Sequence, residues 1–257
     1  MPNLLDLKPE SRFFGMFISR SSEGKSAAAA SFPKPIHYFD VDLRMRGVLA
    51  CKEWMDLKDI SYQSYPPRLN FYESLKNDVA VMSDMIKRRQ TPTKTLVLAS
   101  ATSLCKNLLR EGTELLEAAG HGGKKIGTHR LAGPEEYSYE ASTVYDIFDI
   151  LRGTPCNIII DCHVITKFGK TNPTEKFSEF GPVGEELAIR DKIGANILIY
   201  FDECYRFRKD ETGQNFFVQF RSDIARTAYS QLPNSLDITK KPFYPEWLKL
   251  VGGKANE

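Results

Sequence analysis

The sequence predicts an α/β fold, with a mostly parallel sheet flanked by helices and a C-terminal antiparallel hairpin. Short apolar blocks alternate with amphipathic helical patterns almost from end to end, which is typical of strands joined by crossover helices. Two apolar runs in the last third are joined by a turn around Thr212 and Gly213. The 257 residues suit one core of this kind. We expect an N-terminal segment (1–11), a core (12–240) and a C-terminal tail (241–257).

The individual elements follow from local patterns along the chain. Apolar runs bounded by turn residues predict buried strands, at 12–18, 36–39, 95–98 and 157–162. Apolar residues spaced three or four apart, or small residues after a turn, predict helices, at 25–31, 48–56, 70–89, 103–119 and 139–151. A glycine-rich stretch at 120–137 and a polar stretch at 165–182 predict loops.

Composition excludes several classes of protein. The chain is 42% hydrophobic and 26% charged, as in ordinary soluble proteins, and it has no apolar stretch of the ~20 residues that span a bilayer. Its N-terminus lacks the pattern of a signal peptide, so we expect no membrane role and a place in the cytoplasm of its cell or host. Five scattered cysteines without a CxxC pair predict buried thiols. A net charge of +2 neither favours nor excludes nucleic acid.

A phosphate-binding motif lies between the first strand and the first helix. The segment SRSSEGKS departs from the pattern GxxxxGK[ST] only at its first position, where serine replaces glycine. In that pattern the backbone amides surround the phosphates, the lysine reaches the β and γ oxygens, and the hydroxyl binds magnesium. The alternative is an ordinary strand-to-helix turn with a serine cap. The candidate ATP-binding residues are Ser19, Arg20, Ser21, Ser22, Glu23, Gly24, Lys25 and Ser26.

Hydrolysis also requires carboxylates near this motif. Asp40 and Asp42 follow the next strand, at the edge where open α/β sheets bind ligands, although acids at a strand end can also merely cap a loop. The strand at 95–98 should end in a magnesium-binding acid, yet Ala99 stands there. Either the role passes to Asp40 or Ser100, or the alanine was introduced to trap ATP.

Taken in order, these motifs resemble those of the phage-encoded RecA-like ATPases that assist single-strand annealing and recombination. The resemblance spans roughly residues 12–240. The matching residues are the Phe-Pro-Lys-Pro run at 32–35, Asp40-Val41-Asp42, Ala99 to Leu104 apart from the missing aspartate, His163, Phe201-Asp202-Glu203, Arg221 and Leu232-Pro233. The resemblance implies a RecA-like P-loop core.

The resemblance also implies roles for single residues. Asp42 would be the catalytic carboxylate, and Lys25 and Ser26 would contact phosphate and magnesium. His163 would sense the γ-phosphate, although a histidine at a strand end is as often a hydrogen-bonded core residue. Since RecA-like proteins usually bind ATP between subunits, Arg221 or Arg226 would act on the ATP of a neighbouring protomer in a ring or filament. Either arginine could equally form a plain salt bridge.

The segment after His163 interleaves lysines with phenylalanines. Lysines neutralise phosphates and aromatic rings stack on bases, so this pattern predicts salt-sensitive binding of single-stranded DNA. A solvated loop with partly buried rings is the alternative. The candidate DNA-binding residues are Lys167, Phe168, Lys170, Lys176 and Phe177.

Two functions are compatible with these patterns. The first is an ATPase that binds single-stranded DNA and promotes annealing or strand exchange, with ATP as the assembly switch and a single-strand-binding or annealing protein as a possible partner. The second is a catalytically weak nucleotide-binding scaffold in a phage assembly or replication complex. The missing acid at Ala99 favours the scaffold, and the Lys and Phe segment favours the ATPase.

Overall fold

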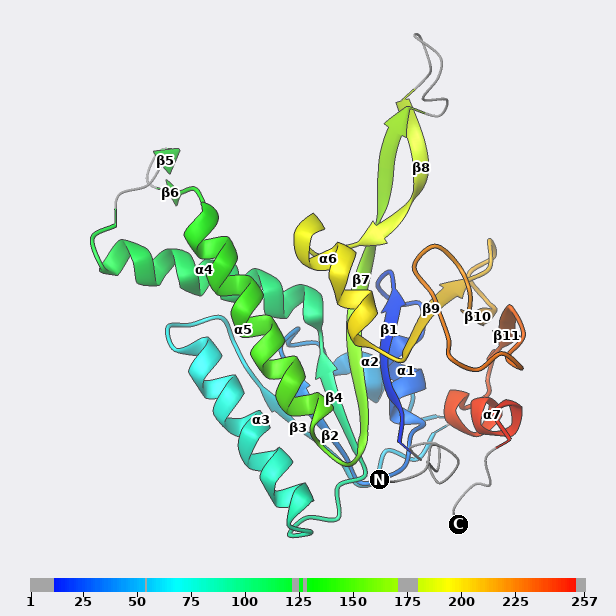
Figure 1. Cartoon of the computed structure of the whole chain (residues 1–257). Helices are drawn as coiled ribbons and strands as arrows, with labels where there is room; N and C mark the ends of the chain where they lie inside the picture. The colour runs from blue at the N-terminus through cyan, green and yellow to red at the C-terminus, as the bar shows by residue number, and fades with distance from the viewer. Residues whose placement is uncertain (1–11, 54, 122–124, 127–128, 171–179, 253–257) are drawn as a thin grey trace, which may run out of the picture.

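The computed structural model describes residues 12–53, 55–121, 125–126, 129–170 and 180–252. Within these ranges, one large sheet has the strand order β11-β10-β9-β1-β7-β4-β2-β3, and β8 pairs with β7 alone (Figure 1). Pairing is parallel from β9 to β3 and antiparallel at β9-β10-β11 and β7-β8. The strands are β1 Phe14–Ser19, β2 Ile36–Asp40, β3 Ile60–Ser64, β4 Thr95–Ala99, β7 Asn157–Lys170, β8 Phe180–Leu187, β9 Glu203–Lys209, β10 Phe216–Gln219 and β11 Ser235–Asp237.

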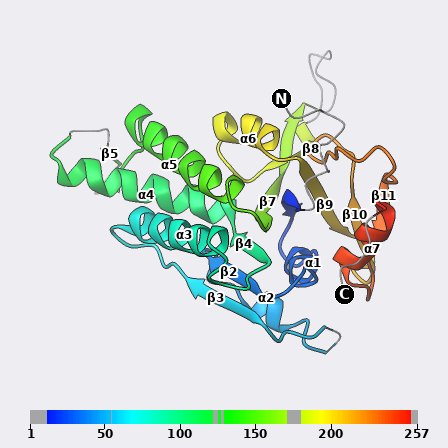
Figure 2. The same ribbon diagram turned by 60° about the horizontal axis from the view of Figure 1, so that its bottom comes forward.

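Helices cover both faces of this sheet (Figure 2). Their apolar residues divide between two clusters on opposite faces. One face carries α3 Phe71–Lys87, α4 Ala101–Ala118, α5 Pro134–Arg152 and α6 Asp191–Ile197, and the other carries α1 Lys25–Ala30, α2 Arg46–Leu49 and α7 Phe243–Leu250. The predicted fold, a mostly parallel sheet flanked by helices with antiparallel C-terminal strands, is confirmed.

Small residues explain how closely α1 approaches the sheet. Its sequence KSAAAA places three consecutive buried alanines, Ala28, Ala29 and Ala30, against the apolar cluster of that face. Strand β1 is buried along its whole length, so its side chains point alternately into both clusters. The strand-turn-helix unit that carries the phosphate-binding candidate is therefore held in the centre of the molecule.

Several expected boundaries are wrong. The short helix expected at 48–56 is instead α2, Arg46–Leu49. The loop expected at 120–137 ends earlier, because Pro134 at the first helical turn begins α5, and it contains the paired segments β5 Lys125–Ile126 and β6 His129–Arg130. Pattern analysis missed β3, β8, α6, β11 and α7.

The largest difference concerns the polar segment after the fourth core strand. We expected a loop over 165–182, but β7 continues to Lys170 and pairs with β8 from Val164↔Leu187 to Lys170↔Phe180. The two strands form an antiparallel ribbon that projects beyond the sheet (Figure 1). Exposed strands carry alternating or wholly polar side chains, so hydrophobicity alone does not distinguish them from a loop.

The C-terminal part of the chain packs on the face that carries α1. Phe243 and Trp247 of α7 are buried in its cluster, and the Trp247 indole donates a hydrogen bond to the Tyr205 hydroxyl at 2.8 Å. The α7 helix therefore completes the apolar core beside the phosphate-binding candidate. In the part of the chain that the structure describes, none of the helices is long and apolar enough to cross a bilayer.

Candidate nucleotide site

The turn between β1 and α1 has the backbone that a phosphate loop requires. Gly24 has a φ of 99°, and a Cβ at this position would lie 3.2 Å from the ring of Phe216. Both conditions favour glycine. Ser19, which stands where the first glycine of the motif is usual, is the last residue of β1 and is part of its parallel ladder. Serine fits there because a strand position needs no left-handed backbone.

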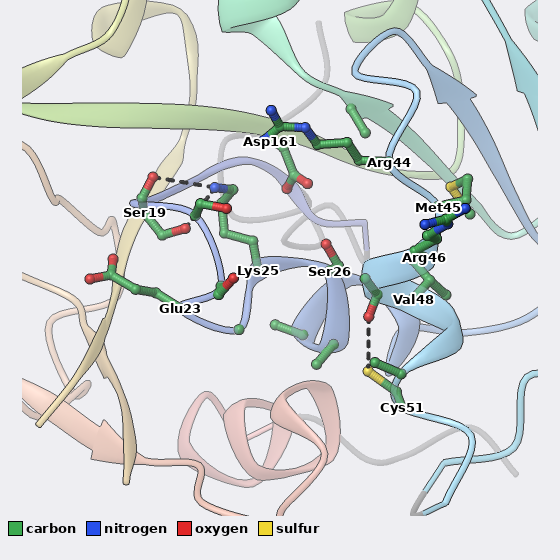
Figure 3. Close-up of a pocket in the computed structure, with 18 of the residues that line it drawn as sticks. Ser19, Glu23, Lys25, Ser26, Arg44, Met45, Arg46, Val48, Cys51 and Asp161 are labelled. Carbon is green, nitrogen blue, oxygen red and sulfur yellow. Dashed lines mark hydrogen bonds between the residues drawn. The ribbon is translucent and has the colours of Figure 1, made fainter. Parts of the chain in front are cut away.

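Lys25 is held at the centre of this site (Figure 3). Its ammonium donates hydrogen bonds to the Ser19 hydroxyl at 2.6 Å and to the Ser19 carbonyl at 3.3 Å, and it lies 3.3 Å from His163 Nδ1. Only 6% of the residue is exposed. Burial lowers its pKa, and the nearby carboxylate of Asp161 opposes that change most strongly.

His163 connects this lysine to Asp42. His163 Nε2 lies 3.1 Å from Asp42 Oδ2, and the Ser100 hydroxyl donates to Asp42 Oδ1 at 2.9 Å. Burial raises the pKa of Asp42, but hydrogen bonds from His163, Ser103 and Ser100 outweigh burial and lower it to about 2. The carboxylate is therefore ionised at neutral pH. Side chains from α1, β7 and the segment after β2 thus form one chain of contacts, Lys25–His163–Asp42.

Asp40 and Ser100, which the sequence analysis proposed as metal ligands in place of an acid at Ala99, both form hydrogen bonds within the chain. Asp40 is buried, and its two oxygens accept hydrogen bonds from the Arg44 amide and the Ser64 hydroxyl, both at 3.1 Å. Burial raises its pKa. Ser100 caps α4, where its side chain accepts from the Ser103 amide. Ser26, the third candidate, lines the cavity beside Lys25.

An aspartate that pattern analysis did not select lies at this site. Asp161 of β7 is 4% exposed, lines the same cavity, and has one carboxylate oxygen, Oδ1, without a hydrogen-bond partner. Burial raises its pKa to about 6, partly opposed by Lys25. An acid inside the apolar run NIIIDC was the available sequence signal, because a buried acid needs a partner or a function.

These groups surround a cavity of about 820 Å³. It lies at the carboxyl ends of β1, β2 and β4 and beside the middle of β7, with α1, α2 and the segment before α7 completing its walls. Four basic side chains also line it: Arg44, Arg46, Lys240 and Lys241. Sequence analysis missed these four because they come from two segments nearly 200 residues apart.

Other side chains of the phosphate-loop candidate connect to the ribbon. Glu23 Oε2 accepts from the Arg20 amide at 2.7 Å and pairs with Arg206 at 2.5 Å. Arg206 is 1% exposed and also pairs with Glu185 of β8 at 2.9 Å. The Arg20 guanidinium donates to Thr166 of β7 at 2.8 Å. The loop and the base of the ribbon are therefore tied together by buried and partly buried charges.

The two arginines proposed to act on a neighbouring subunit lie outside this cavity. The Arg221 guanidinium donates to the carbonyls of Tyr229, Ser230 and Leu232, and so fixes the loop that follows β10. Arg226 donates to the Phe201 carbonyl at 2.5 Å. Both side chains belong to exposed residues, so any contact with ATP would have to be in another copy of the chain.

Three of the proposed DNA-binding residues lie on the ribbon. Lys167, Phe168 and Lys170 are exposed, and Phe168 leaves 59% of its surface accessible. Lys167 also pairs with Glu186 at 3.6 Å. Lys176 and Phe177 lie outside the described residues.

Metal binding by protein side chains alone has no support in the described ranges, where no three His, Cys, Asp or Glu side chains gather as a metal site. Magnesium usually keeps several waters and binds through one or two carboxylates together with nucleotide phosphates. The Ser26 hydroxyl and the unpartnered oxygen of Asp161 fit that second arrangement.

Comparison with known proteins gives structural likenesses only. No protein-family model and no curated protein matches the sequence. One similar solved structure is the KaiC-like protein PH0186 from the hyperthermophilic archaeon Pyrococcus horikoshii OT3, with 12% identity, a TM-score of 0.49, and coverage of 89% of this chain and 86% of that one. Another is the RadB recombinase, with 11% identity, a TM-score of 0.47, and coverage of 89% and 88%. Function must therefore be argued from the site.

Proposed function

We propose that this chain is a RecA-like ATPase that binds ATP with Mg²⁺ in the cavity between α1 and the carboxyl ends of the central strands. The observation that carries the proposal is the contact chain Lys25–His163–Asp42 beside a phosphate-loop turn. It combines a cation for phosphates with an ionised carboxylate at the edge where parallel sheets bind ligands. The cavity of about 820 Å³ is within the usual size for such ligands.

Each member of the chain has a role in hydrolysis. Lys25 would exchange its contacts with Ser19 and His163 for the β and γ oxygens of ATP. Asp42 remains anionic at neutral pH, so it can accept a hydrogen bond from the attacking water and orient it. His163 lies between the two and would respond to the γ-phosphate. Bound Mg²⁺, with Ser26 as one ligand, would neutralise charge on the phosphates.

We further propose that the ribbon of β7 and β8 binds single-stranded DNA. It projects from the sheet (Figure 1), and its residues Lys167, Phe168 and Lys170 are exposed. A large exposed aromatic ring beside lysines provides a stacking surface and phosphate contacts without sequence preference. Such binding would assist annealing or strand exchange, alone or with a single-strand-binding or annealing partner.

The contacts between loop and ribbon support ATP as a switch. His163 and the ribbon lysines belong to the same strand, β7, and Glu23 of the phosphate loop reaches Glu185 of β8 through the buried Arg206. A γ-phosphate that displaces Lys25 from His163 would therefore act directly on the base of the ribbon. The expected consequence is DNA binding that depends on ATP.

Assembly into a homo-oligomer belongs to the same proposal. Arg221 and Arg226 are exposed and do not line the cavity of their own chain, as expected of groups that complete a neighbour's site. ATP should then shift the protein from monomer to ring or filament in sedimentation velocity. In mixtures of wild-type protein and an Arg226→Ala variant, the rate of ATP hydrolysis should fall more steeply than the fraction of wild-type protein.

Fluorescence anisotropy of a labelled single-stranded oligonucleotide tests the DNA proposal. Binding should require ATP, be weaker with ADP or without nucleotide, and fall with salt. Replacing Lys167 and Lys170 by glutamine should reduce the slope of log K against log salt by about 1.4, because each phosphate contact contributes about 0.7 on single strands. Phe168→Ala should weaken binding, whereas Tyr62→Ala, an equally exposed aromatic residue on β3, should not.

Lys25→Ala tests the nucleotide site itself. The variant should lose ATP binding in isothermal titration calorimetry, since the cation that faces the phosphates is gone. Unchanged ATP affinity would refute the site.

The nucleotide-binding scaffold remains a second candidate because of one observation. Ala99 lies in the wall of the cavity, where it provides no carboxylate to the ligand. If ATP drives oligomerisation but turnover is absent and DNA is ignored at every salt concentration, the scaffold is the better description.

A further inference from the structure

Ala99 has a buried acid on each side. In the sheet, β4 lies between β2 and β7, and Asp40 of β2 is the register partner of Ala99. On the other side, Leu98 pairs with Ile160, so Asp161 of β7 follows directly beside Ala99. Side chains alternate along a strand, and Val97 and Ile159, two residues earlier, both point to the face that carries α1. Ala99 and Asp161 therefore face the nucleotide cavity from adjacent strands.

The two acids differ in what they contact. Both oxygens of Asp40 accept hydrogen bonds from within the chain, one from the loop after β2 and one from Ser64 of β3. Asp161 Oδ1 is buried and has no such partner. A buried oxygen left in this state is energetically costly, and a ligand of the cavity is the natural source of the missing contact.

The direction of the Asp161 side chain is consistent with a contact to a ligand in the cavity. Its carboxylate points from β7 toward the space between Lys25 and Ser26, the residues of the phosphate-loop motif that face phosphate and cation (Figure 3). The hydroxyl of Tyr38, which lines the same cavity, is also buried without a partner. Two unpartnered polar atoms on the same wall indicate that a polar or charged ligand group occupies this part of the cavity.

We propose that Asp161 supplies from β7 the acid that β4 lacks at Ala99, and that it anchors the divalent cation bound with the nucleotide. The acid stands one strand, about 5 Å, nearer to β1 and its phosphate loop than an acid at Ala99 would, because β7 lies between β1 and β4. This inference rests on the proposed nucleotide site. It assigns the cation to Asp161 and not to Asp40 or Ser100.

A simpler role for Asp161 would be as a counter-ion for Lys25, and the two roles predict opposite effects. A cation anchor matters only when the metal is present. In its absence, a buried negative charge next to the phosphates repels them, so its removal strengthens the binding of metal-free ATP. If Asp161 instead serves only as a counter-ion that positions Lys25, its removal should lower ATP affinity by the same factor with and without metal.

The experiment compares the wild type and Asp161→Asn, which keeps the shape of the side chain. Affinity for a fluorescent ATP analogue is measured in excess Mg²⁺ and in EDTA, and Mn²⁺ binding to the nucleotide complex is followed by electron paramagnetic resonance. We expect Asp161→Asn to weaken binding of the ATP analogue about 10- to 100-fold with Mg²⁺, the usual range for the loss of a residue that positions a metal ion or its ligands. Binding in EDTA should be unchanged or tighter, and Mn²⁺ affinity should fall.

Further variants separate the competing assignments. Adding Ala99→Asp to Asp161→Asn should restore the dependence on Mg²⁺, because it returns a carboxylate to the same face one strand away. Asp149→Asn, an exposed position on α5, serves as the control and should match the wild type. Equal losses with and without metal, or loss of Mg²⁺ dependence in Asp40→Asn but not in Asp161→Asn, would overturn the proposal. If the wild type binds no ATP, the nucleotide site fails as well.

Discussion

The buried carboxyl group of Asp161 makes the stability of the nucleotide-free protein depend on pH. Its pKa is about 6 in the folded chain, against an ordinary value of 3.8. Between these values the folded state holds a proton that the unfolded state has lost, so stability falls as pH rises. This group's contribution is fully present below pH 3.8 and is lost as pH rises through 6. The difference in pKa corresponds to about 3 kcal/mol.

Asp161→Asn removes this dependence because an amide does not titrate in this range. Of the total, about 2 kcal/mol falls between pH 4.5 and 7.5, where the wild type should lose that much stability relative to the variant. At neutral pH the ionised carboxylate therefore costs the ligand-free wild type stability that it has at low pH, and the variant has no such loss. Such an exchange of stability for function is expected of a residue held in place for its ligand.

Urea denaturation in EDTA, without nucleotide, measures the effect at several pH values between 4.5 and 7.5. The difference in the free energy of unfolding between Asp161→Asn and wild type should grow with pH. Asp223→Asn, a substitution at an exposed position, serves as the control and should give a curve parallel to the wild type. A difference between Asp161→Asn and wild type that stays constant with pH would refute the reasoning.

Three further substitutions test the framework of the site. Gly24→Ala should abolish ATP binding and lower stability, measured by calorimetry and thermal melting, because alanine resists a φ of 99° and its Cβ would press on Phe216. Arg206→Met should cost about 1–3 kcal/mol in urea denaturation, since it removes the buried guanidinium that joins Glu23 to Glu185 and leaves Glu185 only Arg20 and Arg208, and it should make DNA binding less dependent on ATP. Trp247→Ala should cost about 3–5 kcal/mol if α7 is part of the core, whereas an unchanged midpoint would make α7 dispensable.

Much of the fold could be predicted because buried parallel strands are continuous apolar runs. The runs that contain Phe17, Val97 and Ile159 were each identified, and so was the amphipathic helix α3. The failures were elements whose sequences carry no such pattern. Strand β3, with mostly exposed residues, lies at the edge of the sheet, and the outer half of β7 has β8 as its one strand partner among the described strands.

The candidate site divides in the same way. Lys25 and its loop belong to a contiguous motif, and Asp42 and His163 each follow a recognisable strand, so the sequence alone brought them forward. Asp161 lies within the apolar run NIIIDC, whose pattern predicts only a buried strand. The sequence suggests Ser100 as a magnesium ligand, but in the structure its hydroxyl caps α4 and donates a hydrogen bond to Asp42. These contacts depend on tertiary neighbours that the sequence pattern does not show.

The order of strands in the sheet could not be read from the chain. The sequence by itself determined an α/β core, a phosphate-binding turn, and the absence of an acid at Ala99, since each depends on residues that are adjacent in the chain. Only the tertiary structure placed β7 between β1 and β4, and with it Asp161 beside Ala99, His163 beside Lys25, and the ribbon beside the phosphate loop. The pairing of β7 with β4 and β1 joins residues 62 and 144 positions apart through backbone hydrogen bonds that are nearly independent of side-chain identity, so local patterns do not specify it.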